Sequence, residues 1–260
     1  MEPVLLEKEG PVAWLTLNRP EKRNALSLEL MGDMLRKLNT VAQDPDVRVV
    51  VIKGNGPGFC AGHDLEEMAG SDLDVEHFNH LFSVCAEMMQ RLQKLPQPVI
   101  AQVHGIATAA GCQLVAACDL AIAETGAQFA TPGVKIGLFC TTPAVPLVRI
   151  IGKRRAMEML LTGRFISSEE AERYGLINRI VPPENLGEKT RNLAMEIAQY
   201  SRHTLAYGKD TFYKQVDLDM RSAYDYATHA IAINCVDEDA QEGMLAFLEK
   251  RKAKWKNRNE

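Results

Sequence analysis

Three β-rich segments separated by longer helical stretches constrain the possible folds most strongly. The segments are VAWLTLN (12–18), VRVVVIKG (47–54) and PVIAQVHG (98–105). Short apolar runs that alternate with helical stretches are typical of strands joined by crossover connections. The sequence therefore predicts an α/β fold in which these three segments are strands.

Helix signals define the stretches between these strands. Ser27 is a residue type that caps helix N-termini, and we expect the first helix to begin after it. The apolar stripe of this helix consists of Leu28, Met31, Leu35, Leu38 and Val41. The helix ends before Asp44-Pro45, and a second one, at about 75–95, ends at the two prolines of LPQP.

Helical patterns dominate after Pro132, where strand signals become sparse. A capping box formed by Ser167 and Glu170 begins one of these helical blocks. The helices expected in this half of the chain span 153–162, 168–174, 185–200 and 237–254. We find no flexible linker and no repeat, and we expect a helical C-terminal subdomain.

Composition excludes several classes of protein. With 260 residues, 46% of them apolar, the chain is long enough for one large domain or one and a half. The formal net charge of −4 gives no basis for a nucleic-acid partner. The local exception is the basic segment EKRKAKWKNRNE (249–260), which is typical of a solvated helix end and is also suited to a phosphate-bearing ligand.

The cysteines and the apolar runs indicate the compartment. The six cysteines lack paired CxxC spacing, so we expect buried free thiols rather than disulfides or a metal site. No stretch of about 18 uninterrupted apolar residues occurs, and the N-terminus carries acidic residues. We therefore predict a cytoplasmic protein with no membrane partner.

Two turns rich in small residues follow the second and third expected strands. They are GPGFCAGHDLEEM (56–68) and HGIATAAGCQL (104–114). Ligands of open α/β folds bind at the carboxyl ends of strands, and small residues let backbone N–H groups approach a ligand closely. If Ala110 lies at the start of a helix, its N–H has no intrahelical acceptor, and two such groups form an oxyanion hole. For the second turn alone, close packing of a buried helix is the simpler explanation.

The sequences of both turns, together with other motifs, resemble those of the crotonase (enoyl-CoA hydratase/isomerase) superfamily. The resemblance extends over the whole chain. The matching stretches are LNRPEKRNALS (17–27), FCAGHDL (59–65), KLPQPVIAQVHGIATAAGCQLVAACDLAIA (94–123), AQFATPGVKIGL (127–138), LTGRFISSEEAERYGLINRIVP (161–182) and EGMLAFLEKRK (242–252). The resemblance implies a spiral of ββα turns and a helical C-terminal region that drives trimerisation, with trimers or dimers of trimers as the assembly.

An acyl-CoA thioester is the substrate or ligand that this resemblance implies, with no further cofactor. It assigns acyl-CoA binding to a core domain, residues 1–195, and oligomerisation with further CoA contacts to residues 196–260. It also implies that the backbone N–H groups of His63 and Ala110 hold the thioester carbonyl. The residues expected to contact CoA are Ala61, Asp64, Leu65 and Glu66, then Lys22 or Arg23 with Ala25 in the same stretch, and Phe247 and Lys250 of this or another subunit.

Departures from the family pattern concern the reaction itself. Hydratases of the family use two glutamates, and the positions that match them here hold Gln113 and Gly133. A neutral amide orients a water molecule but cannot take its proton, and glycine has no side chain. Since general acid–base groups contribute about 10² to 10⁴ each, we expect hydratase activity to be weak or absent. Other enzymes of the superfamily use an acid further along the chain. The position that matches it here falls near Thr141, so this acid is missing as well.

Several alternatives remain open at this point. AGHD around His63 is shared with a methylmalonyl-CoA decarboxylase of the superfamily, and decarboxylation needs no strong base. A thioesterase-like Cys–His pair would combine Cys60, Cys112 or Cys140 with His63 or His104, although inert buried thiols are the more common case. A non-catalytic acyl-CoA-binding protein is the third alternative. A dinucleotide-binding oxidoreductase is disfavoured because no GxGxxG follows a strand.

Overall fold

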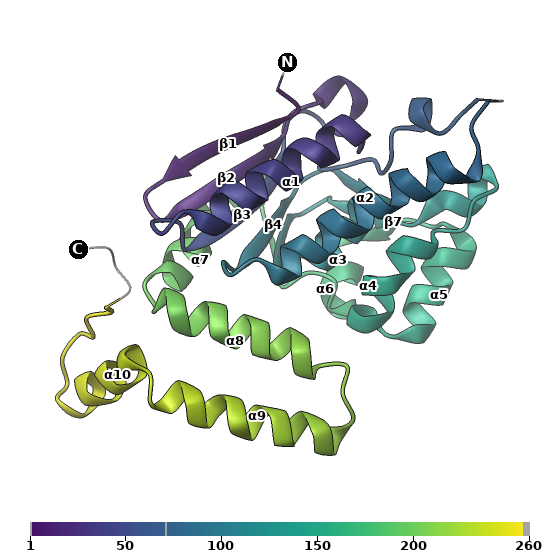
Figure 1. Ribbon diagram of the computed structural model, residues 1–260. Helices are drawn as coiled ribbons and strands as arrows, with labels where there is room; N and C mark the ends of the chain where they lie inside the picture. The colour runs from purple at the N-terminus through teal and green to yellow at the C-terminus, as the bar shows by residue number, and fades with distance from the viewer. Residues whose placement is uncertain (1, 71, 257–260) are drawn as a thin grey trace.

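The computed structural model describes residues 2–70 and 72–256, and its centre is a six-stranded sheet (Figure 1). The strands are β1 (Val4–Glu9), β2 (Val12–Leu17), β3 (Val49–Gly54), β4 (Val99–Val103), β6 (Leu120–Glu124) and β9 (Arg179–Val181), in spatial order β1-β2-β3-β4-β6-β9. Only the β1–β2 pair is antiparallel, and every other neighbouring pair is parallel. The three strands predicted from the sequence are confirmed as β2, β3 and β4.

A second, three-stranded sheet was not predicted. It contains β5 (Ile106–Thr108), β7 (Gln128–Ala130) and β8 (Ile166–Ser167), in that spatial order. The chain passes from β4 to β5 through Gly105, which has a φ of 56° and touches the carbonyl of Pro57 so closely that a Cβ would overlap it. This turn of the chain therefore gives one strand to each sheet before a helix follows: β4, β5 and then α3 (Ala110–Ala117).

Helices cover both faces of the large sheet. On one face α1 (Leu28–Gln43) and α2 (Val75–Lys94) contribute to the main core, and on the other α7 (Leu186–Ala198) packs on Trp14 and Val51. Every residue of β2 is buried, which explains why its sequence is a continuous apolar run rather than an alternating one. All eight residues of α3 are buried as well, so this helix lies inside the molecule.

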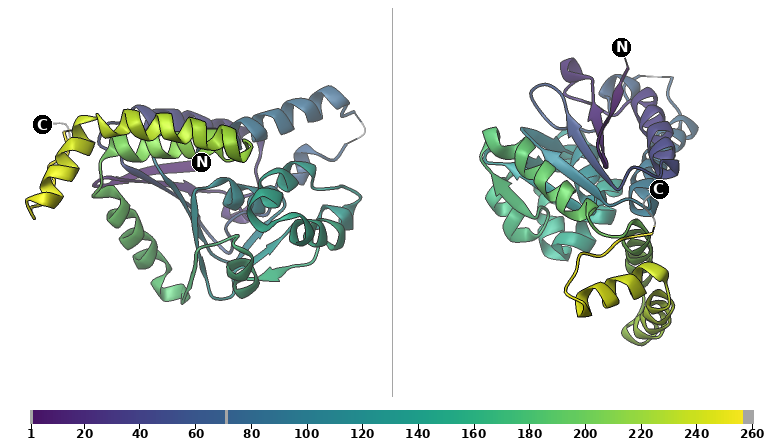
Figure 2. Two further views of the ribbon diagram at one scale, coloured as in Figure 1. Left: turned by 90° about the horizontal axis from the view of Figure 1, so that it is seen from below. Right: turned by 90° about the vertical axis from the view of Figure 1, so that its left-hand side faces the viewer.

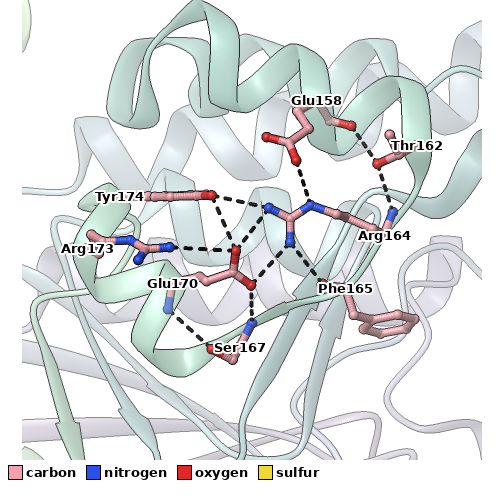
Figure 3. A network of polar contacts seen from close by, with 8 residues as sticks. All are labelled: Glu158, Thr162, Arg164, Phe165, Ser167, Glu170, Arg173 and Tyr174. Carbon is pink, nitrogen blue, oxygen red and sulfur yellow. Dashed lines mark hydrogen bonds and ion pairs between the residues drawn. The ribbon is translucent and has the colours of Figure 1, made fainter.

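Three helices follow β7, and a network of charged groups around Arg164 joins the last two of them (Figure 3). They are α4 (Thr141–Ile151), α5 (Lys153–Thr162) and α6 (Ser168–Tyr174). The Arg164 guanidinium donates to both carboxylate oxygens of Glu170, at 3.0 and 3.1 Å, and its Nε donates to Glu158 at 2.9 Å. Glu170 also completes the predicted capping box with Ser167, which is confirmed. One arginine therefore fixes the end of α5 against the start of α6.

The C-terminal helices form an arm that extends from the rest of the molecule (Figures 1 and 2). They are α8 (Arg202–Gln215), α9 (Met220–Cys235) and α10 (Glu238–Leu248). The expected helix over 237–254 is wrong in its last part. Lys250 has a φ of 55°, and the following residues turn back so that Arg251 pairs with Glu242 of α10 at 2.6 Å. The last four residues of the basic segment 249–260 lie outside the described residues.

The structure also describes the cysteines and shows whether any helix could cross a membrane. Five cysteines are buried and free, as predicted, whereas Cys235 at the end of α9 is free but exposed. Among the described residues, no helix is both long enough and apolar enough to cross a membrane. The same part of the chain contains no cluster of His, Cys, Asp and Glu suited to a metal ion.

A buried ion pair fastens the arm to the large sheet. The Lys209 ammonium of α8 lies 2.6 Å from the Asp119 carboxylate and donates to the carbonyls of Leu92 and Gln97 at 2.8 and 3.0 Å. Tyr213, one turn further along α8, donates to the other oxygen of Asp119 at 2.8 Å. Asp119 also accepts the Val99 N–H at 2.7 Å, which ties it to β4 of the large sheet.

We expect Lys209→Met to destabilise the protein by about 3 kcal/mol, because it leaves the buried Asp119 charge without its cation. Tyr213→Phe is the matched control and removes one hydrogen bond, worth about 1 kcal/mol. Urea unfolding followed by circular dichroism measures both values. An equal loss for the two variants would contradict the assignment of the ion pair as the main fastening.

Candidate functional site

The two small-residue turns meet through direct main-chain contact. Thr108 N–H donates to the Cys60 carbonyl at 2.9 Å, and Cys60 N–H donates to the Ile106 carbonyl at 3.1 Å. A Cβ on Gly111 would overlap the Cys60 carbonyl, so the close approach requires glycine at this position. The small residues therefore serve close packing of the helix entrance, and that packing brings the turns together.

This contact places the backbone N–H groups of His63 and Ala110 at one cavity. Leu26 donates to the Gly62 carbonyl at 2.7 Å and accepts from Asp64 at 3.0 Å, which leaves the intervening His63 N–H without a strand partner. Ala110 is the first residue of α3, so its N–H has no intrahelical acceptor. Among the described residues, neither N–H donates a hydrogen bond to the protein, and both residues line the same cavity of about 460 Å³.

Ala109 turns the Ala110 N–H toward that cavity. Its φ of 50° and ψ of −116° belong to a region that favours glycine, and such a conformation costs a non-glycine residue about 1–3 kcal/mol. Two hydrogen bonds hold it there: Ala109 N–H donates to Ala130 at 2.8 Å, and its carbonyl accepts from Gln113 N–H at 3.0 Å. The strain is therefore balanced by contacts with β7 and with α3 itself.

The walls of the cavity are mostly apolar. None of the described lining residues carries a carboxylate, and the titratable side chains are those of His63, Lys135 and Cys140. The Lys135 ammonium lies 5.8 Å from the centre of the Phe165 ring. The complete lining is Ala61, His63, Leu65, Met68, Phe82, Ala109, Ala110, Pro132, Gly133, Lys135, Ile136, Leu138, Phe139, Cys140, Thr141, Thr142 and Pro143.

The His63 ring beside the cavity has a buried nitrogen without a hydrogen-bond partner in the described chain. The ring contacts Phe82 of α2 edge to face, with centroids 5.1 Å apart, and its Nε2 is buried without a hydrogen-bond partner among the described residues. Burial lowers the pKa of His63 from its ordinary 6.5 to about 4. The imidazole is therefore neutral at physiological pH.

Gln113 and Gly133 occupy different surroundings. Gln113 lies in α3 with 4% of its surface exposed, its Oε1 is buried without a partner among the described residues, and it is not one of the lining residues. Gly133 does line the cavity, but a Cβ there would lie 2.8 Å from both the Cys140 Sγ and the Leu138 carbonyl oxygen. A side chain at 133 therefore requires the segment 138–140 to move.

Among the three candidate thiols, the structure brings one to the cavity beside His63. Cys60 and Cys112 are fully buried away from it, and burial raises the pKa of each to about 12. Cys140 lines the cavity, and burial raises the pKa of its thiol. His104 lies elsewhere, bonded to the Gly56 carbonyl at 2.9 Å. A Cys–His pair is thus restricted to Cys140 and His63, with the thiol protonated at neutral pH.

Most residues expected to contact CoA are brought together beside the cavity. Ala61 N–H donates to the Arg23 carbonyl at 3.0 Å, and Lys22 forms an ion pair with Glu66. Arg19 was not predicted as part of this cluster. Its guanidinium binds the Asp64 carboxylate and the carbonyl of Ala25, each at 2.9 Å, and so joins the first turn to the PEKRNA stretch. Its position directly before the PEKRNA stretch is the sequence signal that could have identified it.

Phe247 and Lys250 are not brought to this cluster within the chain. They lie at and just beyond the end of α10, on the C-terminal arm (Figure 1), and Phe247 is 83% exposed. Their predicted contact with CoA from the same subunit is therefore not seen. A contact from another subunit stays a prediction.

Comparison with known proteins identifies the family. The model of the enoyl-CoA hydratase/isomerase family matches residues 7–258. The chain belongs to the enoyl-CoA hydratase/isomerase family. A rat relative named enoyl-CoA hydratase domain-containing protein 3, mitochondrial, is 44% identical over 241 residues, which cover 93% of this chain and 80% of the relative. The resemblance stated from the sequence motifs is confirmed.

Solved structures of family members confirm the fold. A crystal structure described as an enoyl-CoA hydratase of Mycobacterium smegmatis has a TM-score of 0.94 and 45% identity, covering 97% of this chain and 98% of that one. The human enoyl-CoA hydratase domain-containing protein 3 has a TM-score of 0.94 and 42% identity, covering 97% and 100%. The predicted α/β spiral with C-terminal helices is thus the fold of this family member.

The lowered pKa of His63 predicts a specific pH dependence of stability. Between pH 6.5 and 4 the His63 imidazole is protonated in the unfolded chain but not in the folded state. The free energy of unfolding therefore falls as the pH is lowered through this window. We expect wild type to lose up to about 3 kcal/mol relative to His63→Phe between pH 7 and pH 4. Urea unfolding of both proteins at each pH measures the difference, and parallel pH profiles would contradict it.

Proposed function

We propose that this protein binds an acyl-CoA thioester and polarises its carbonyl between the N–H groups of His63 and Ala110. The observation that carries the proposal is that two unpartnered backbone donors, on different turns, line one apolar cavity. Preorganised donors of this kind stabilise negative charge on a carbonyl oxygen, and in a dry cavity they do so strongly. CoA itself would lie along the cluster that Arg19 organises, next to Lys22, Arg23 and Asp64.

Hydration of an enoyl-CoA should be weak or absent in this site. Hydration needs a group that takes a proton from water and one that gives a proton to carbon. Gln113 is a neutral amide outside the cavity lining, Gly133 has no side chain, and the described lining contains no carboxylate. The site therefore retains the means to stabilise an enolate without the base that usually forms one.

Decarboxylation is the second candidate reaction, and the carboxylate-free lining favours it. Loss of CO₂ generates the enolate directly, so the two N–H groups are sufficient to stabilise the developing charge and no strong base is required. Thioester cleavage through Cys140 is less favoured because burial keeps the thiol protonated. A protein that binds acyl-CoA without turning it over is the remaining alternative.

The C-terminal arm supports assembly into homotrimers, or trimers stacked as a dimer. Its helices expose large apolar side chains, among them Phe212, Met220, Tyr224, Ile231, Val236 and Phe247. In such an assembly Phe247 and Lys250 of one subunit would reach the CoA of another. We predict that the protein is cytoplasmic. Its free buried thiols fit any reducing compartment. The rat relative is named as a mitochondrial protein.

Butyryl-CoA should bind with micromolar or tighter affinity, and Ala110→Pro should weaken that binding about fivefold through loss of one hydrogen bond. Proline is tolerated at the first position of a helix, so the variant removes the N–H while α3 can still form. Ala110→Gly is the matched control that retains the donor. Titration calorimetry measures affinity, with thermal unfolding to verify the fold. Absence of binding to wild type would overturn the proposed function.

Crotonyl-CoA hydration should be at least about 10³-fold slower than in a hydratase with both glutamates. The loss of ultraviolet absorbance of the enoyl thioester measures the rate. A rate equal to that of such a hydratase would mean that another residue supplies the missing proton transfers. Gln113→Glu alone should restore little activity, since Gln113 lies outside the cavity lining.

A further inference from the structure

Helix α10 has little apolar contact that could fix its direction. All of its residues are described, and those that are buried are Asp239 and Ala246. The large apolar side chains Leu245, Phe247 and Leu248 are each at least half exposed. Most helices in proteins are held by burial of an apolar face. Other contacts must therefore set the direction of α10.

The segment that follows α10 supplies these contacts, and we call residues 251–256 the C-terminal strap. The chain reverses at Lys250, whose φ is 55°, and the strap runs back beside α10 (Figure 1). The Arg251 guanidinium donates to both carboxylate oxygens of Glu242, at 2.6 and 2.8 Å. Glu242 also accepts the Lys254 N–H at 2.7 Å. A two-pronged pair of arginine and carboxylate is both strong and directional.

The far end of the strap is attached to the body of the protein. The Trp255 indole N–H donates to the carbonyl of Gln199, directly after α7, at 2.7 Å. The Trp255 ring lies against Gly243 of α10, where an added Cβ would be 3.3 Å from two ring carbons. Asp239 of α10 accepts the hydroxyl of Ser201, the capping residue of α8. The strap and Asp239 therefore join α10 to the junction of α7 and α8.

The strap begins directly after the two residues of the arm that are predicted to contact CoA. Phe247 lies in the last turn of α10, and Lys250 is the residue at which the chain reverses. A positive φ is unfavourable for a lysine, so contacts on both sides must maintain it. The Arg251 N–H donates to the Ala246 carbonyl at 3.0 Å and closes this turn. The direction of the Lys250 side chain is thus set by α10 before it and by the strap after it.

We propose that the C-terminal strap positions Phe247 and Lys250 for contact with the nucleotide half of CoA, with Glu242 and Trp255 as the positioning residues. This inference rests on the proposed function, because it assumes that CoA is the ligand and that the arm of one subunit reaches the CoA of another. The positioning residues themselves do not touch the ligand. Side chains that are already held in place lose less conformational freedom on binding, so the strap increases the affinity for the nucleotide.

The test compares butyryl-CoA with butyryl-pantetheine, which lacks the nucleotide, by titration calorimetry. Trp255→Ala should weaken the binding of butyryl-CoA about fivefold and leave that of butyryl-pantetheine unchanged. Glu242→Gln should act in the same direction, and it replaces Trp255→Ala if that variant does not fold. Lys252→Ala changes an exposed residue of the same strap and is the matched control. It should bind both thioesters as wild type does.

A double variant tests whether the strap acts through Lys250. Lys250→Gln removes the charge without changing the backbone preference, and it should also weaken butyryl-CoA binding about fivefold. If Trp255 acts by positioning Lys250, the double variant Trp255→Ala/Lys250→Gln should still lose about fivefold. Two independent effects would multiply to about 25-fold.

Each other outcome overturns the positioning role. An equal loss for both thioesters in Trp255→Ala would mean that the variant disturbs the cavity as a whole, and a multiplied loss in the double variant would mean that the strap acts apart from Lys250. Dissociation of the assembly in Trp255→Ala, measured by light scattering, would mean that the strap maintains the assembly instead. If wild type binds the two thioesters equally well, carbonyl binding stands and the strap inference fails. If neither thioester binds, the proposed function fails as well.

Discussion

Main-chain contact between the turns that follow β3 and β5 is the constraint on which the rest of the site depends. Cys60 exchanges backbone hydrogen bonds with β5, and Gly111 approaches the Cys60 carbonyl too closely for any side chain. Because both turns are fixed by backbone groups, the positions of the His63 and Ala110 N–H groups do not depend on the identity of their side chains. The conformation of Ala109 shows that the arrangement is maintained even at the expense of local strain.

The surroundings of those two donors determine what they can do. Helix α3 is buried on all sides, and the cavity at its N-terminus is lined by apolar groups with no carboxylate among the described residues. Hydrogen bonds to a developing negative charge are stronger in such surroundings than in water. Burial in the same apolar surroundings keeps His63 neutral and Cys140 protonated, so the cavity is better suited to holding charge on a ligand than to moving protons.

Sequence patterns predicted the elements with strong periodicity and missed those without it. Strands β2, β3 and β4 and helices α1, α2, α5 and α6 were predicted because their apolar spacing and caps are local signals. The small sheet was missed because β5, β7 and β8 have only two or three residues each. The Lys209–Asp119 pair was missed because its members are far apart in sequence. The His63 and Ala110 positions came from family motifs, whereas the orphaned Nε2 depends on packing against Phe82 that no local pattern reveals.

Gly133 has a consequence for how this family member can change over time. The space that a side chain at 133 would enter is occupied by a carbonyl oxygen of the main chain as well as by the Cys140 sulfur. A glutamate introduced there would therefore be harmful until the loop at 138–140 had already shifted, and such a shift brings no benefit while residue 133 is glycine. A second wall carboxylate in this cavity therefore requires coordinated changes at residue 133 and in the loop at 138–140, and no single substitution supplies it.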